Sequence, residues 1–271
     1  MRIPFFTLLC FLVLVACQND NKTMNDAKKT MNDAKTAAKD AMKEVGKKKY
    51  TLTPFSKSPS FPDAKIKSMT YEKGKFNYEI TGDYELGTQT PDAKSKMCAN
   101  SGKGQHIHLI VDKEPYAAKY VPSFEHAVSD GDHHILSFLS RSYHESIKSP
   151  GASTALIAKV KGGGIESSEP VTEPTLFYSR PKGTYVGKKD TDKIMLDFFL
   201  VNVTLTNGYT VKADINGETH SITKWQPYYI EGLPMGENTV TLTLLKDGKM
   251  VDSPINPVTR TFSLKDLPEA G

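Results

Sequence analysis

The sequence predicts an all-β protein with two β-sandwich domains in tandem, preceded by a signal peptide and a short helical tether. Three observations lead to this prediction. After about residue 50, short runs with alternating apolar and polar residues replace helical periodicity. Glycine-containing turn signals recur between those runs. The second half of this region also repeats the first half in the order and spacing of its segments.

The first 16 residues have the organisation of a signal peptide. Arg2 precedes an apolar run that is too short to span a membrane as a mature helix. Residues 14–17, Leu-Val-Ala-Cys, resemble the lipobox of bacterial lipoproteins, and the resemblance implies cleavage before Cys17 and lipidation of Cys17. We therefore expect a lipid anchor in the outer membrane, facing the periplasm or the cell surface. An ordinary signal peptide followed by a chance cysteine is the alternative.

Residues 17–49 are expected to form a tether. Met24, Met31 and Ala38 recur at heptad spacing within a lysine-rich and alanine-rich segment, and Gly46 ends the pattern. Alanine-rich seams bury little surface, and short helices are marginal alone. The pattern therefore favours a solvated helical tether over a short coiled coil.

Two immunoglobulin-like sandwiches are expected at 50–165 and 166–271, joined near the glycine-rich stretch 161–170. Asn216-Gly217 is the strongest hairpin signal, because both residues tolerate positive φ. Residues 75–86 and 194–206 are expected to form strands that correspond in the two copies.

Six of the seven histidines lie between His106 and His144, all in the first copy. The matching positions of the second copy carry no histidine, so the sandwich fold itself does not need these side chains. We interpret them as functional, with the second domain as a scaffold or spacer. Drift at solvent-facing positions is the competing explanation.

His106 and His108 alternate with Ile107 and Leu109, so we expect the histidines to point away from the sandwich core. Antiparallel pairing of segments 105–112 and 134–141 brings the start of one to the end of the other. Two groups of candidate ligands follow. The first contains His106, His108 and His144, with Cys98 from the extra segment Thr88–Lys103; the second contains His126, His133, His134 and Asp112.

Imidazole suits copper and zinc. We expect the first group to bind a metal, copper or zinc, or a small ligand, with copper ahead of zinc if the Cys98 thiol joins. Exposed polar strand residues with no ligand are one alternative. A groove of histidine and tyrosine that binds a protein or peptide without a metal is the other.

Charge and motifs exclude other classes. The formal net charge of +4 is small, and basic and acidic residues are mixed, so we expect no nucleic-acid partner. The chain has no Gly-x-Ser-x-Gly elbow, P-loop or His-Glu-x-x-His motif. We expect a binding protein, not an enzyme.

The segment 100–160 resembles the bacterial secreted domain of unknown function DUF4399. The resemblance is carried by His106, His108, Asp112, Gly131, His133 and His144. It implies an immunoglobulin-like fold, similar in outline to copper-handling periplasmic domains, with no established activity. Lipoproteins of this kind are often labelled phosphopeptide-binding, and no motif of this sequence points to phosphate recognition.

Overall fold

The computed structural model describes Met31 and residues 49–268. The expected signal peptide, Cys17 and all of the expected tether except Met31 and Lys49 lie outside the described residues. The described residues 49–268 belong to one compact unit, and the following concerns that unit. None of its described helices has the length and apolar character needed to cross a membrane.

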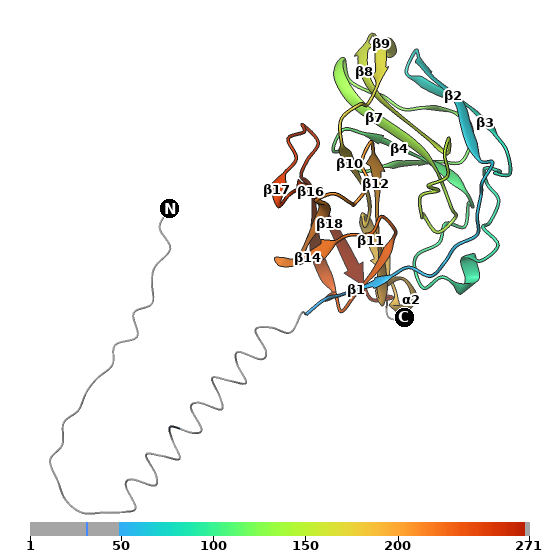
Figure 1. Ribbon diagram of the computed structural model, residues 1–271. Coiled ribbons are helices and arrows are strands. Elements are labelled where there is room, and N and C mark those ends of the chain that lie inside the picture. Colours follow the sequence, from blue (N-terminus) through green and yellow to red (C-terminus); the bar gives the residue numbers. More distant parts are fainter. Residues whose placement is uncertain (1–30, 32–48, 269–271) are drawn as a thin grey trace, which may run out of the picture. The chain divides into compact units, whose positions relative to one another are not determined.

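The described chain is all-β, as predicted, and its strands form two immunoglobulin-like sandwiches (Figure 1). The first sandwich pairs a three-stranded sheet with a five-stranded sheet. In spatial order the sheets are β2 (Lys65–Glu72), β3 (Lys75–Thr81) and β6 (Ser123–Glu125); and β5 (Ala117–Lys119), β4 (His106–Val111), β7 (Gly131–Ser140), β8 (Ser153–Lys161) and β9 (Gly164–Pro170).

The second sandwich repeats this topology. Its sheets are β1 (Thr51–Pro54), β15 (Tyr228–Glu231), β12 (Lys193–Val201) and β10 (Thr175–Arg180); and β11 (Gly183–Val186), β18 (Val258–Lys265), β16 (Gly236–Lys246), β13 (Tyr209–Ile215) and β14 (Glu218–Ile222), with β17 (Lys249–Met250) paired to β16. The order β2-β3-β6 matches β10-β12-β15, and β5-β4-β7-β8 matches β14-β13-β16-β18. The described helices are short: η1 (Ala93–Ser95) and α2 (Lys188–Thr191).

Local sequence explains the hairpins. Asn216 and Gly217 have φ values of 48° and 87°, the conformation that a tight turn between β13 and β14 requires. The expected strands at 75–86 and 194–206 are found as β3 and β12, each ending several residues earlier than expected.

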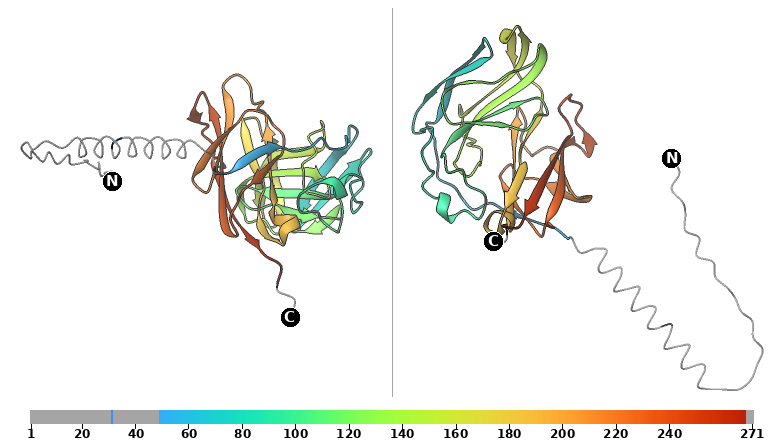
Figure 2. Two further views of the ribbon diagram at one scale, coloured as in Figure 1. Left: turned by 90° about the horizontal axis from the view of Figure 1, so that it is seen from below. Right: turned by 180° about the vertical axis from the view of Figure 1, so that it is seen from behind.

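The domain boundaries differ from the expected ones at two places. Gly162 and Gly163 turn the chain from β8 into β9 instead of linking the domains, so the boundary at 165/166 falls inside β9. Strand β1, expected in the first domain, instead pairs with β15 of the second sandwich. Both views of Figure 2 show this blue strand beside the orange and red strands.

The face of β4 that carries the histidines lies against the second sandwich. Ile107 and Leu109 point into the core of the first sandwich, as predicted. The alternate residue Ile110 belongs to a separate apolar cluster that joins the sandwiches. Its buried members are Ile110, Tyr116, Leu136 and Phe138 from the first sandwich and Phe177, Phe199 and Ile255 from the second. The second sandwich therefore covers this face and is more than a spacer.

Candidate metal centre

His106 and His108 project from β4 on the same face, because alternate strand residues share a face. Both residues are fully buried, with an exposed fraction of 0%. The alternative of exposed strand polarity is therefore wrong for this pair. Strand β4 pairs antiparallel with β7, with His106 opposite Ser140, which is the predicted arrangement.

His144 reaches the same point from a turn after β7. The backbone NH of His144 donates to the carbonyl of Arg141 at 2.8 Å, which closes the turn. His144 has a φ of 70°, in the left-handed region that costs a non-glycine residue about 1–2 kcal/mol. Such strain is found preferentially at functional sites. This turn holds the third imidazole, 9% exposed, against the two of β4.

The three imidazoles converge through their ring nitrogens. Nε2 of His106 lies 2.8 Å from Nε2 of His108 and 3.0 Å from Nδ1 of His144. One nitrogen from each ring lies within 4.8 Å of the other two. In a tetrahedral site with metal–nitrogen bonds of about 2.0–2.1 Å, neighbouring nitrogens are about 3.3 Å apart. Small movements of the rings therefore give the spacing of a metal site.

A hydrogen bond at Nδ1 fixes which ring nitrogen of His106 carries the proton. Nδ1 donates to the carbonyl of Gly104 at 2.8 Å, so Nε2 of the neutral ring carries a lone pair. That lone pair faces two ring nitrogens and can accept only one good hydrogen bond. A metal ion satisfies all three nitrogens at once. Orientation of a ligand histidine by a backbone carbonyl is the usual arrangement around protein metals.

The three rings are held neutral. Burial lowers the pKa of His106 to about 4, with further lowering from Arg180 and Lys182. Burial also lowers the pKa values of His108 and His144 well below the usual range. Protons therefore do not compete for these nitrogens at neutral pH.

Residues of the second sandwich complete the surroundings. Ser179 Oγ lies 3.3 Å from Nδ1 of His108, and Arg180 Nε donates to the Tyr116 hydroxyl at 3.0 Å. Lys182 Nζ donates to the Tyr116 carbonyl at 2.6 Å. Burial lowers the pKa of Lys182 to about 8, so its ammonium is mostly charged at pH 7. Sequence reasoning missed Ser179, Arg180 and Lys182, because no local motif links them to the histidines.

Cys98 is not part of the group that the described residues form. Its thiol is buried in another cluster, with Tyr143, Met195 and Tyr229. Burial raises the pKa of this thiol to about 12, which disfavours the thiolate that metals bind. The expectation that Cys98 is a ligand is not supported by this geometry. The extra segment does contact the turn that carries His144, because the backbone NH of Ser101 donates to the Ser142 carbonyl at 2.9 Å.

The second predicted group lies at the opposite end of β4 and β7, as expected from the antiparallel pairing. Asp112 accepts from Nδ1 of His133 at 2.7 Å and from the backbone NH of His134 at 2.7 Å. Nε2 of His133 lies 2.9 Å from the Ser129 carbonyl and 3.3 Å from the Ser129 hydroxyl. Both ring nitrogens of His133 thus have hydrogen-bond partners within the chain. His126 instead packs near the ring of Phe76, 6.2 Å between centroids.

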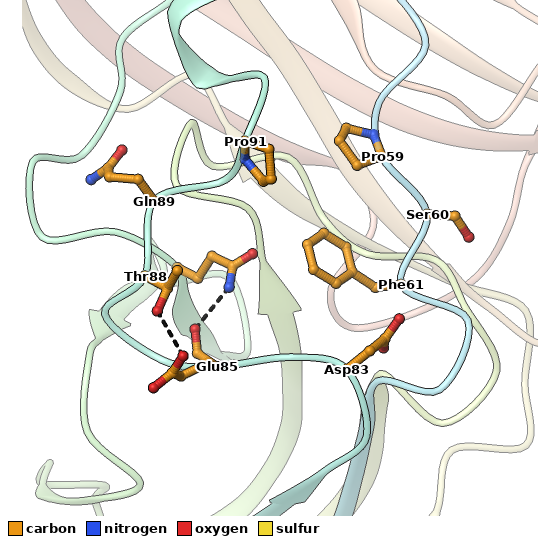
Figure 3. A pocket seen from close by; sticks show the side chains of 9 residues that line it. Pro59, Ser60, Phe61, Asp83, Glu85, Thr88, Gln89 and Pro91 are labelled. Carbon is orange, nitrogen blue, oxygen red and sulfur yellow. Dashed lines mark hydrogen bonds between the residues drawn. The ribbon is translucent and has the colours of Figure 1, made fainter.

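The surface also carries shallow pockets. Figure 3 shows one of them. Its volume is about 330 Å³. Thr88 Oγ1 donates to the Glu85 carboxylate at 3.1 Å, and the Gln105 amide donates to the Glu85 carbonyl at 2.8 Å. The apolar wall of this pocket comes from Pro59, Phe61 and Pro91. Another, of about 530 Å³, is lined by His133, His134 and Asp112. The buried histidines line neither of them.

No family model and no curated protein matches the chain. Among solved structures, the fibronectin(III)-like modules of Clostridium thermocellum CbhA share 11% identity over 80% of this chain and 94% of that chain, with a TM-score of 0.27. A Ca²⁺-stabilized adhesin of an Antarctic bacterium shares 12% identity over 75% of this chain and 50% of that chain, with a TM-score of 0.22. The fold assignment rests on the sheet topology given above.

Proposed function

We propose that this protein is a lipid-anchored envelope protein of the outer membrane that binds one transition-metal ion, copper or zinc, through His106, His108 and His144. The observation that carries the metal site is the convergence of three buried ring nitrogens on one point. The lipobox-like residues before Cys17 support the anchor. The proposed role is binding and not catalysis.

A protein-binding or peptide-binding role on the same face has less support. Residues of the second sandwich cover this face, and both strand histidines are inaccessible. A partner would have to separate an apolar contact between the sandwiches, which costs about 25 cal/mol for each Å² of apolar surface exposed. Binding of phosphopeptides at this face meets the same obstacle.

Calorimetric titration of the purified full-length protein tests the proposal, with Zn²⁺ and, under reducing anaerobic conditions, with Cu⁺. We expect sub-micromolar binding of one ion per chain for at least one of the two metals. The double variant His106→Ala/His108→Ala should lose this binding. The matched control His126→Ala removes a histidine outside the centre and should keep it.

Thermal unfolding gives a second readout. A metal that binds only the folded chain raises its unfolding temperature by mass action, in the wild type and in His126→Ala. Circular dichroism establishes that each variant is folded. No binding of either metal, or binding that survives in the folded double variant, would contradict the proposal.

A further inference from the structure

Two cationic side chains from the second sandwich lie close to the histidine centre. The Arg180 guanidinium donates to the Tyr116 hydroxyl at 3.0 Å, and that hydroxyl lies 3.3 Å from Nδ1 of His144. The guanidinium is therefore only two hydrogen bonds away from a ligand nitrogen. Arginine does not lose its charge in proteins, so this positive charge is permanent.

Lys182 adds a second positive charge behind the ring of Tyr116. The imidazole of His108 stacks on Tyr116, with centroids 3.6 Å apart and planes at 7°. Lys182 Nζ lies 3.9 Å from the same ring centroid. Since the imidazole fills one face of the ring, the ammonium occupies the other face. One aromatic ring thus separates this ammonium from His108.

No anionic ligand offsets these charges within the metal-ligating group of the described residues. The group consists of three histidines and contains no carboxylate or thiolate. The imidazoles contribute no charge when neutral. The centre is also buried, so that salt and water screen it weakly. An ion entering the centre therefore meets two positive charges with no negative partner in that group.

We infer that Arg180 and Lys182 make this centre select a singly charged metal ion, Cu⁺, over a doubly charged ion such as Zn²⁺. The inference rests on the proposed function, because it concerns the same site. Imidazole nitrogen suits copper and zinc alike, so the donor atoms do not decide between them. The surrounding charge does, because Coulomb repulsion is proportional to the charge of the ion and is twice as large for Zn²⁺ as for Cu⁺.

The variant Lys182→Gln tests the inference, since it removes the charge and keeps a donor for the Tyr116 carbonyl. The full-length protein is titrated with Zn²⁺ and with Cu⁺, the latter in competition with a colorimetric Cu⁺ chelator. We expect Zn²⁺ affinity to rise about tenfold or more, and Cu⁺ affinity to rise by clearly less. Lys249→Gln, which neutralises an exposed lysine of the same sandwich, should change neither affinity.

The change in the ratio of the two affinities decides the outcome. If the ratio of Zn²⁺ affinity to Cu⁺ affinity is the same in wild type and Lys182→Gln, the charge selection is overturned. This outcome includes the case in which Zn²⁺ carries an anion into the site. Binding of neither metal, or binding that persists in His106→Ala/His108→Ala, refutes the metal site itself. The two failures are therefore distinguishable.

Discussion

The hydroxyl of Tyr116 lies between Arg180 and His144, accepting from the guanidinium Nε at 3.0 Å and lying 3.3 Å from the imidazole Nδ1. Tyr116 belongs to the first sandwich and Arg180 to the second. This hydroxyl therefore connects the histidine centre with the neighbouring sandwich. Tyr116 is 2% exposed, so water does not substitute for the lost oxygen when the hydroxyl is removed.

Tyr116→Phe should keep the stacking on His108 but leave the buried Nε of Arg180 without its acceptor. We expect the free energy of unfolding to fall by about 1–3 kcal/mol, the usual cost of an unsatisfied buried polar group. Urea denaturation of the metal-free protein measures it. Tyr120→Phe is the matched control, because its hydroxyl pairs with the uncharged Ser101 hydroxyl at 2.7 Å. Equal losses in both variants would contradict a special role for the Arg180 bond.

Stability of the metal-free protein should fall on mild acidification. The pKa of His106 is lowered to about 4 in the folded chain, and unfolded histidine has a pKa of about 6.5. Between these values the unfolded chain binds more protons, so acid favours unfolding. The contribution of His106 is complete above about pH 6.5 and is lost as the pH falls toward about 4.

His108 and His144 act in the same direction, because burial lowers their pKa values too. Each histidine contributes a slope of up to about 1.4 kcal/mol per pH unit. Urea unfolding at about pH 7, 6 and 5, with a chelator present, measures this slope. The range lies above the pH at which most carboxylates titrate. His106→Gln should reduce it. A free energy of unfolding that is constant over this range would show that the rings are not held neutral.

Cys98 should behave as a structural residue. Burial raises the pKa of its thiol to about 12, and the residue is 3% exposed. We expect a thiol reagent to label it slowly in the folded protein and rapidly in denaturant. Cys98→Ala should leave metal affinity unchanged within a factor of about two, which is under 0.5 kcal/mol. A tenfold loss of Cu⁺ affinity in this variant would restore the thiol as a ligand.

The sequence pattern was sufficient to place the histidines relative to one another. Alternation puts His106 and His108 on one face of a strand. Antiparallel pairing, with His106 opposite Ser140, then brings His144 to the same end. The same pairing separates His133 from this group and places it beside Asp112. These relationships depend on local periodicity and on one strand pair, and both can be predicted from the sequence.

What covers the histidines was not predictable in this way. A polar strand face next to solvent and one next to another domain have the same pattern of residues. Arg180 lies 64 positions from Tyr116, and no motif links the two. Cys98 was expected near the metal because its segment precedes β4. The structure instead places its thiol in an apolar cluster with Tyr143, Met195 and Tyr229. These residues are far apart in the sequence, so no local motif predicts the cluster.

The pairing of β1 with β15 has a consequence for the order in which the chain assembles. Thr53 of β1 bonds to Glu231, 178 positions later. During synthesis β1 is therefore made before all other strands of the described chain, but it has no partner until most of the chain has followed. Closing so long a loop is slow compared with forming local hairpins. Strand β1 can therefore join its sheet only after every strand of the first sandwich has been made, when among the described strands β16, β17 and β18 are still to follow.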